Sequence, residues 1–457
     1  MTQTLIPQSG LLTNYDETSR ILDATTPEFL KPLRQLGAEE FAKVGLPNHK
    51  DEEFKYLSFR EVEKINFQSS YGATVSRFDI TDRTLAGKLD AITLTFVNGQ
   101  HSPELSHDHV LPEGLWIGTL EDAILEREAE VHQYFSKIAT LEGRLGSSND
   151  ERFKWLNQAF LDAAMVVIVK SNEKIAKPIH LNFIHLANHG PCAIYPRVLV
   201  ILEDSAAAQI IESYNGLEGQ YFINGLTEVF QESNSEFEHI RIQNETRDSF
   251  HIGTLAIEMK TGSRYHGTNL HFGAQLARLD LNAFLNGENI EALFNGVAIG
   301  SGDQVVDNHT RIDHAKPNCN SFEIYKTVLD DHATGIFNGK IFVYEDAQKT
   351  DAKQTNKAVL LSKNATINTK PQLEIFADDV KCTHGATVGK LQEDALFYLR
   401  ARGIAKEEAE SLLVYAFAAD VLNMIPNADL KEVLEAKLFE CLTVSRRLKE
   451  SQQTKGG

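Results

Sequence analysis

The central segment of the chain, from residue 165 to residue 390, alternates apolar and polar residues in short runs without helical periodicity. This alternation is typical of β-strands, whose successive side chains point to opposite faces. It is clearest in the runs Leu279, Leu281, Ala283, Leu285 and Val198, Val200, Leu202. Because no helices separate the strands, a doubly wound α/β domain is excluded. A sandwich, a barrel or a β-solenoid is left, and the absence of a strict repeat does not choose between them.

Turn residues divide this segment into short pieces. The pairs Asn286-Gly287, Asn295-Gly296 and Asn338-Gly339 each fall between apolar runs. Glycine and asparagine adopt the left-handed backbone conformation that tight turns require. We therefore predict a turn at each pair and a strand on either side of it.

Residues 1–164 are predicted to form a mostly helical N-terminal region. An apolar face from Phe29 to Leu36 indicates one helix, and Thr26 is the expected N-cap residue of that helix. Residues 122–145 have a charged helical pattern, whereas Ile92–Val97 is a predicted strand.

Residues 391–457 are predicted to form a helical C-terminal domain after the β core at 165–390. Its second helix, over Lys406–Ile425, contains the run Leu412–Ala419, which is apolar on every face. A helix of this kind is normally buried on all sides. We expect it to be either the centre of a small bundle or a helix with one flank covered by a partner protein.

Composition limits the class of protein. The formal net charge of −19 argues against binding to nucleic acid or to anionic membrane surfaces. The four cysteines are scattered and do not form a disulfide framework, which indicates a reducing compartment. The first residues, MTQTLIPQSG, lack the features of a signal peptide, and no apolar run approaches the ~20 residues of a transmembrane helix. We expect a cytoplasmic protein.

Cys382 and His384 are the one compact pair of soft metal-ligand residues in the chain. On a strand, residues i and i+2 share a face, so the thiol and the imidazole are predicted to lie side by side. Such a pair suits zinc, iron or an iron–sulfur cluster, but two ligands leave a tetrahedral site incomplete. The alternative interpretation is a half-buried cysteine and a hydrogen-bonded histidine near the end of a strand.

Other motifs are weaker. Gly385, Gly389 and Lys390 resemble a phosphate-binding loop, but the spacing is one residue short and Leu391 replaces the required hydroxyl residue. An ATPase is therefore disfavoured. Two further groups could be read as metal sites, although turns and strand ends also use such residues: His180, His185, His189 and His309, His314, Cys319.

The segment Pro371–Gly403 resembles the signature of the SufB/SufD family, the scaffold subunits of the SUF iron–sulfur cluster assembly complex. Its Cys-Thr-His-Gly-Ala-Thr run matches the SufD branch, because the SufB branch typically has His-Glu-Ala-Thr there and no cysteine two residues earlier. The similarity is strong over the C-terminal third and follows the overall layout elsewhere. One departure is Phe54, where the family usually has tryptophan. Further matching positions are Asp307–Thr310, Ser321, Lys326, Phe337–Ile341 and Ala347–Ala352.

This resemblance implies a right-handed parallel β-helix flanked by helical domains, and a scaffold rather than an enzyme. It also implies pairing with a SufB subunit through the β-helix and docking of the SufC ATPase on the C-terminal helices. A nascent iron–sulfur cluster, or its iron, would then be held transiently at the interface with the partner subunit. His384 and Cys382 are the residues expected to contact that metal.

Two alternatives stay open from the sequence. One is a stand-alone homodimeric β-helix binding protein without cluster chemistry. The other is a β-helix enzyme such as a polysaccharide lyase, a class that is usually secreted. The sequence also leaves open whether the isolated chain is a homodimer and whether a flavin binds the assembled complex.

Overall fold

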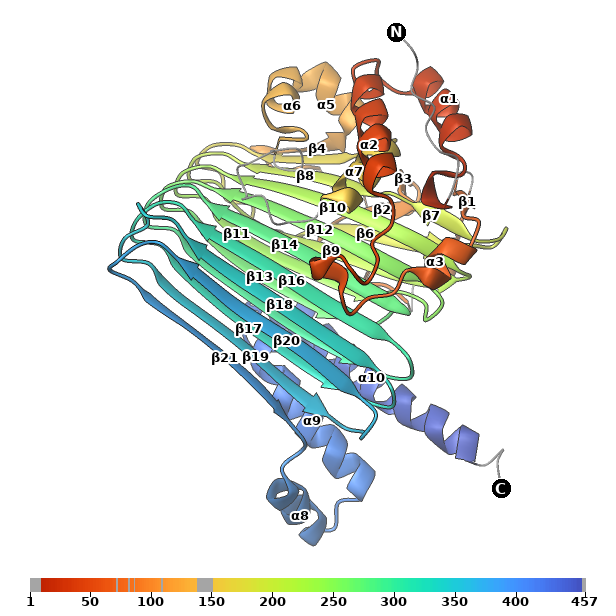
Figure 1. Ribbon diagram of the computed structural model, residues 1–457. Coiled ribbons are helices and arrows are strands. Elements are labelled where there is room, and N and C mark those ends of the chain that lie inside the picture. Colours follow the sequence, from red (N-terminus) through yellow and green to blue (C-terminus); the bar gives the residue numbers. More distant parts are fainter. Residues whose placement is uncertain are drawn as a thin grey trace.

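The computed structural model describes residues 10–70, 73–80, 83–85, 87–107, 110–137 and 151–453, and its centre is a β-helix of parallel strands (Figure 1). The strands are β1 (Gln68–Ser69), β2 (Ile92–Val97), β3 (Gln100–His101), β4 (Leu115–Thr119), β5 (Met165–Val169), β6 (Ile179–Leu186), β7 (Cys192–Ile194), β8 (Arg197–Leu202), β9 (Ala207–Glu218), β10 (Tyr221–Gln231), β11 (Glu236–Asn244), β12 (Phe250–Met259), β13 (Arg264–His271), β14 (Leu276–Leu285), β15 (Glu291–Gly300), β16 (Val305–His314), β17 (Asn320–Leu329), β18 (Thr334–Val343), β19 (Asp351–Leu360), β20 (Thr366–Ile375) and β21 (Lys381–Gly389). The helices are α1 (Tyr15–Thr25), α2 (Leu30–Val44), α3 (Arg60–Lys64), α4 (Arg77–Ile80), α5 (Leu120–Glu126), α6 (Glu128–Tyr134), α7 (Arg152–Ala159), α8 (Glu393–Ala401), α9 (Lys406–Leu422) and α10 (Ala428–Gln453), with short 3₁₀ turns at Gly10–Leu12 and Glu52–Phe54.

The strands form two facing sheets. Sheet A has the order β20-β18-β16-β14-β12-β10-β8-β5-β4, and sheet B has the order β21-β19-β17-β15-β13-β11-β9-β6-β2-β3. From β9 onward the chain alternates between the sheets, so each strand pairs in parallel with the strand one turn away. A mainly β fold with a parallel β-helix core and helical ends is therefore confirmed.

The turns of the β-helix differ in length. Arg264 pairs with Glu291, 27 residues later, and Glu291 pairs with Asn320, 29 residues later. The next step along this ladder is 31 residues, from Asn320 to Asp351. Insertions in the bends absorb these differences while the strands stay in register. This variation explains why the sequence shows period-two alternation without a strict longer repeat.

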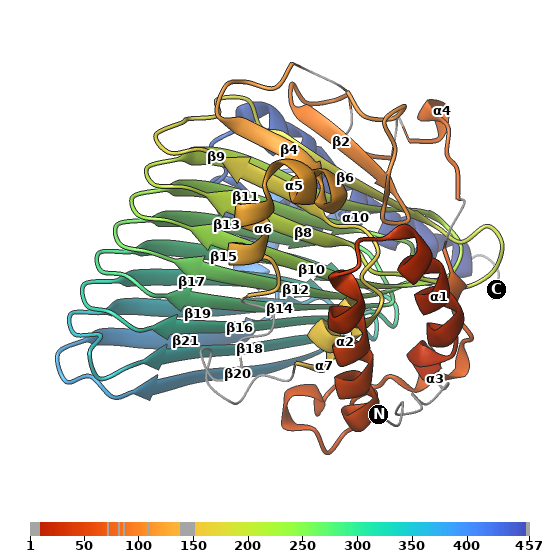
Figure 2. The same cartoon turned by 90° about the horizontal axis from the view of Figure 1, so that it is seen from above.

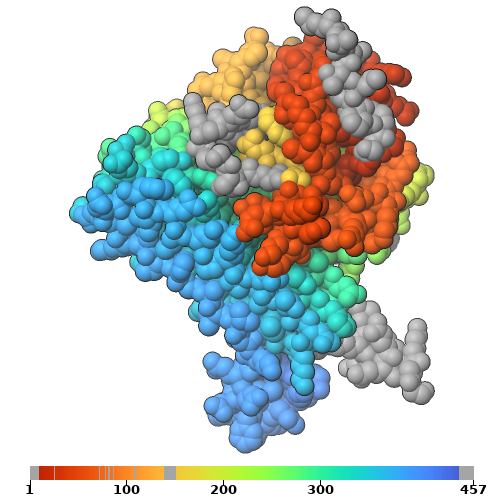
Figure 3. Space-filling view, in the orientation of Figure 1, coloured from red at the N-terminus to blue at the C-terminus, as the bar shows by residue number. Residues whose placement is uncertain are grey.

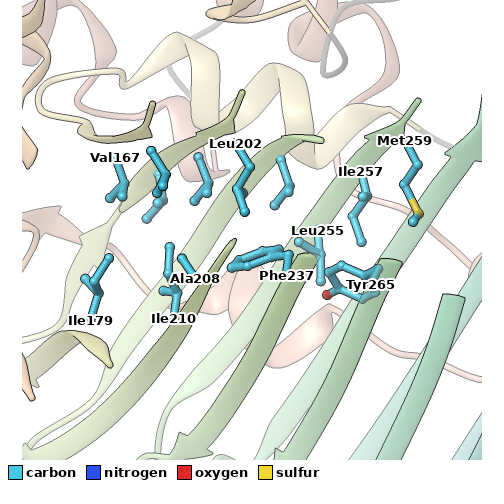
Figure 4. Close-up of a cluster of buried hydrophobic side chains, with 14 of the residues drawn as sticks. Val167, Ile179, Leu202, Ala208, Ile210, Phe237, Leu255, Ile257, Met259 and Tyr265 are labelled. Atoms are coloured by element: carbon cyan, nitrogen blue, oxygen red, sulfur yellow. The ribbon is translucent and has the colours of Figure 1, made fainter. Parts of the chain in front are cut away.

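Apolar side chains from both sheets fill much of the interior. Figure 4 shows Leu255 and Ile257 of sheet A facing Ile210 and Phe237 of sheet B. Every second residue of a strand points inward, which is the physical origin of the alternation in the sequence. Burying each such side chain contributes roughly 1.5–3 kcal/mol relative to leaving it in water.

Only one of the three predicted Asn-Gly turns is present. Asn286-Gly287 does connect β14 to β15, but Asn295-Gly296 lies in the middle of β15 and Asn338-Gly339 in the middle of β18. Gly296 is needed there because a side chain would overlap the ring of Tyr325. Close packing inside the β-helix, rather than a turn, explains this glycine.

The N-terminal helices cover the outer face of sheet A (Figures 1 and 2). Helices α2 and α7 cross closely at Gly37, where an added Cβ would lie 2.7 Å from the Ala159 nitrogen. Phe153 of α7 packs in the same apolar cluster as Phe222 and Ile252 of sheet A. This layer holds the N-terminal helices against sheet A.

Three details of this region differ from the sequence predictions. Thr26 does not cap α2; its hydroxyl donates to the Leu22 carbonyl at 2.6 Å and so closes α1, while α2 begins at Leu30. The strand at Ile92–Val97 is confirmed, but it belongs to sheet B, so the sheets begin well before residue 165. The predicted helical stretch 122–145 consists of two short helices, α5 and α6, that are separated at Arg127, and residues 135–137 are not helical. Residues 138–145 lie outside the described residues.

The C-terminal helices α9 and α10 pack on the outer face of sheet B (Figure 1). Val414 and Ala418 of α9 contact the same cluster as Leu270 and Val297 of sheet B, whereas Leu412 is 38% exposed. The apolar run of α9 is thus covered on one side by the chain's own sheet. Within the described ranges, no helix is both long and apolar enough to cross a membrane.

Candidate metal centre

The pair Cys382 and His384 lies on β21, the last strand of sheet B. In the parallel ladder, Cys382 is adjacent to Ala352 and His384 to Gln354 of β19. Ala352 and Gln354 are buried. Gln354 pairs with Glu323 of β17, and Glu323 pairs with Phe294 of β15, which is part of the apolar core between the sheets. Both predicted ligands therefore share the inward face of their strand, at the final turn of the β-helix.

The surroundings of the two side chains differ. Cys382 is half-buried and packs against Ile341, Val343 and Ala377, whereas His384 is exposed. Burial raises the pKa of the Cys382 thiol, so this group keeps its proton at neutral pH. A metal ion would have to displace that proton, because the thiolate is the ligand form.

Cys382 and His384 supply two ligands of the four that zinc or a cluster iron takes. Among the residues that the structure describes, no group of three or more His, Cys, Asp or Glu side chains is arranged to hold a metal ion. A second molecule that meets β21 could complete the coordination at this end of the β-helix.

The last turn of the β-helix presents two edge strands and exposed apolar side chains. Strands β20 and β21 each have a strand neighbour on one side only among the described residues. Ile375 is 39% exposed, Phe376 59% and Val388 49%. Unpaired edges and apolar side chains together make a surface that pairs readily with another chain. We call this surface, made by β20, β21 and Phe376, the open end.

The glycines that resembled a phosphate-binding loop also lie at the open end. Gly385 and Gly389 are part of the extended strand β21 and pair with Thr355 and Val359 of β19. A phosphate-binding loop wraps its amide groups around the anion instead of continuing a ladder. The local structure is therefore that of a strand.

The first histidine group is not brought together. His180 points to the outside of sheet B, where its ring lies 2.7 Å from the Ser213 hydroxyl. His185 points to the interior, with its ring 3.4 Å from Glu245. His189 follows the end of β6. The sheet itself separates these side chains, so they do not form a metal site.

The second group is also divided between two faces. His309 lies on the outside of sheet A, 3.0 Å from Asp307, and His314 lies inside, 2.8 Å from the Ser321 hydroxyl. The Cys319 thiol donates to a main-chain carbonyl at 3.1 Å. Each residue has a local structural partner, as expected for residues at turns and strand ends.

A buried polar network inside the β-helix was not predicted from the sequence. Glu212 accepts hydrogen bonds from Tyr214 at 2.6 Å, from His239 at 2.9 Å and from Arg241 at 3.2 Å. Burial favours the neutral form of Glu212, but His239 and Arg241 outweigh it and hold the pKa of this carboxyl well below its usual range. The available signal was the alternation itself, which places charged residues at inward positions.

The C-terminal helices provide a second exposed surface. None of the α8 residues is buried, and Phe397 is 75% and Tyr398 56% exposed (Figure 3 shows this part of the chain protruding below the β-helix). Helix α9 is tied to β17 by the buried Lys326, whose Nζ lies 2.6 Å from the Phe417 carbonyl and 2.5 Å from Asp420.

Comparison with known proteins identifies the family. Residues 184–417 match the model of the SufBD core domain of SUF system FeS cluster assembly, and residues 7–181 match the model of the SufBD protein N-terminal region. An iron-sulfur cluster assembly SufBD family protein of Synechocystis sp. is 32% identical, covering 93% of this chain and 92% of the relative. The iron-sulfur cluster assembly protein SufD of Escherichia coli is 30% identical, covering 90% and 93%. The chain therefore belongs to the SufB/SufD family of iron–sulfur cluster assembly proteins and is a SufD homologue.

Proposed function

We propose that the chain is a scaffold subunit that pairs with SufB at the open end and binds the SufC ATPase through its C-terminal helices. A nascent iron–sulfur cluster, as the cargo of the complex, would be held at the SufB interface. The observation that carries this proposal is the position of Cys382 and His384 on the inward face of β21, which is itself an edge strand of the open end.

The chemistry of the pair suits temporary binding. A neutral imidazole is a weaker cluster ligand than a thiolate, and the Cys382 thiol must lose a proton before it can bind iron. Both properties favour release of the finished cluster. Pairing of a second subunit at the open end would shield the cargo from oxygen and from free thiols, and would supply the missing ligands.

Helix α8 and the exposed side of α9 are the proposed SufC surface. Phe397, Tyr398 and Leu412 expose apolar area that the chain itself does not cover. Lys326 links α9 to β17, which is two strands from β21 in sheet B. A force applied to α9 would therefore act on the sheet that carries His384.

The decisive test compares His384→Ala with Lys381→Ala in the assembled complex. Lys381 is exposed and lies on the same strand but on the opposite face, so it is a matched control. We expect His384→Ala alone to lose cluster formation while assembly and ATP hydrolysis continue. Cluster formation at the parental rate by His384→Ala would refute the ligand role.

A second test addresses the SufC surface. Removal of residues 405–457 would strip the cover from the outer face of sheet B, because α9 and α10 pack there. The double substitution Phe397→Ala/Tyr398→Ala in α8 avoids this problem. It should weaken SufC binding and leave SufB pairing intact; unchanged SufC binding would contradict the assignment.

The scaffold role also predicts that the purified chain does not hydrolyse ATP. ATP turnover that co-purifies with the chain through several columns would contradict it. The alternative, a stand-alone homodimer without cluster chemistry, is favoured by the same exposed edges at the open end. Measuring the mass of the particle formed by the chain alone and with SufB added distinguishes the two functions. Only the scaffold should give up its homodimer to form a complex with SufB.

A further inference from the structure

Behind His384, a hydrogen-bonded pair of buried side chains occupies the same inward column of sheet B. His384 is adjacent to Gln354 of β19, and Gln354 is adjacent to Glu323 of β17. Gln354 is 2% and Glu323 1% exposed, although the next strand, β21, is at the surface. The last turn of the β-helix thus has a buried polar pair behind His384, next to the apolar cluster that packs around Cys382.

The side-chain amide of Gln354 is held in place on two sides. Its Nε2 donates to Glu323 Oε2 at 2.6 Å. On the facing sheet, a methyl group at Gly339 would overlap this amide, so the glycine provides the space that the side chain occupies. A buried amide with its nitrogen bound to a carboxyl group has a fixed direction for its oxygen.

The oxygen of this amide, Gln354 Oε1, is buried and has no hydrogen-bond partner within the described structure. Leaving such a group unpaired is costly, so an available donor should bind to it. Parallel strands lie about 4.8 Å apart, and a histidine ring on the neighbouring position can reach across that distance. The adjacent residue in the column is His384.

We propose that Gln354 is a positioning residue for His384: its oxygen accepts a hydrogen bond from one ring N–H and leaves the other ring nitrogen unprotonated for iron at the open end. This inference rests on the proposed function. Metal-binding histidines generally donate their second ring N–H to a carbonyl or carboxylate group, which fixes the tautomer and the ring orientation. Glu323 acts through Gln354 by fixing the direction of the amide.

The test is the tautomer of His384 in the isolated chain without metal, read from the ¹⁵N shifts of its ring nitrogens at a pH where the ring is neutral. The signals are assigned by their disappearance in His384→Gln. We expect one dominant tautomer in the parent and in Gln354→Glu, which keeps an acceptor oxygen. Gln354→Leu should give a mixture of both tautomers.

The matched control is Gln243→Leu. Gln243 is also a buried glutamine bound to a carboxylate, with its Nε2 2.6 Å from Glu245, but it lies on β11, far along sheet B from β21. The Gln243→Leu substitution should leave the His384 tautomer unchanged. If Gln354→Leu fails to fold, Glu323→Leu/Gln354→Leu removes both partners without leaving an unpaired carboxyl group.

An unchanged tautomer in Gln354→Leu, or in the double variant, would overturn the proposal. An equal change in Gln243→Leu would also overturn it, because the effect would then be a general loosening. Cobalt(II) titration of the SufB-bound chain is the second readout, where we expect roughly tenfold to 100-fold weaker binding in Gln354→Leu. If the tautomer changes but cobalt(II) binding does not, the hydrogen bond stands and the ligand role of His384 fails.

Discussion

The two ends of the β-helix differ along one inward column of sheet B, which runs parallel to the column that contains His384. Phe96 on β2 begins this column and Val388 on β21 ends it. Phe96 is 4% exposed and stacks on Phe183 with ring centroids 4.9 Å apart, whereas Val388 is 49% exposed. The first turn, which we call the closed end, is covered by other parts of the chain, whereas the last turn leaves inward side chains such as Val388 exposed. The proposed subunit pairing therefore concerns the end whose apolar side chains the described chain does not cover.

The largest effect is expected at the closed end, the first turn of the β-helix, where Phe96 of β2 pairs with Phe183 of β6. Phe183 is stacked between Phe96 and Tyr214, with both centroid distances 4.9 Å. Phe183→Ala removes this packing and leaves a cavity, so the free energy of unfolding should fall by about 3–5 kcal/mol. Urea denaturation measures this free energy. The control is Val388→Ala, for which the free energy of unfolding should change little. Similar losses in both variants would remove the contrast between the ends.

Glu323 provides a pH test of the interior near the open end. Burial raises the pKa of Glu323 to about 7 from an ordinary value of 4.5. Between these values the unfolded chain has released the proton and the folded chain still binds it, so stability falls as the pH rises and the loss is complete above about 7. Glu323→Gln should therefore stabilise the chain by about 2–3 kcal/mol more at pH 8 than at pH 5.

Glu212, in the polar network further from the open end, should behave with the opposite sign. His239 and Arg241 hold its pKa low despite burial, so its contribution to stability is present at neutral pH and is lost as the pH falls. The measurement is the free energy of unfolding of Glu212→Gln relative to the parent, across the same pH range. If both variants show the same sign, the pKa assignment that predicts the opposite sign is wrong.

A smaller effect concerns association at the open end. Phe376 is 59% exposed and packs against Phe342 with ring centroids 5.2 Å apart. Phe376→Ser should weaken pairing with SufB, or self-association, by about 1–2 kcal/mol, because the apolar area is buried only in the assembly. Sedimentation measures it. Val110→Ser, which changes an even more exposed apolar residue elsewhere, should have no effect.

The smallest effect is a difference in thiol reactivity. Cys192 on β7 is buried, and burial raises its thiol pKa to about 12. Cys382 is only half-buried; burial raises the pKa of its thiol as well, but a reagent can reach it more easily. Iodoacetamide should modify Cys382 before Cys192, slowly at pH 7 and faster as the pH increases, because the thiolate reacts. Peptide mass spectrometry follows both sites. Earlier modification of Cys192 would contradict the burial of this thiol.

Much of the fold could be predicted because inward and outward positions alternate along every strand. The run from Leu279 to Leu285 shows this directly, and the helical ends follow from their own periodicity. The glycines were harder. Gly296 leaves room for the Tyr325 ring of the next turn. The two residues are 29 positions apart, so no local sequence pattern contains this contact.

For the candidate site, the sequence by itself determined that Cys382 and His384 share a strand face, because side chains alternate along a strand whatever surrounds it. The family motif likewise lies in a continuous run of residues. Only the tertiary structure decided that this face is the inward one, that it lies at an open end, and that Gln354 and Glu323 stand behind it. These facts depend on register between strands of different turns, and the register is set by packing across bends of variable length.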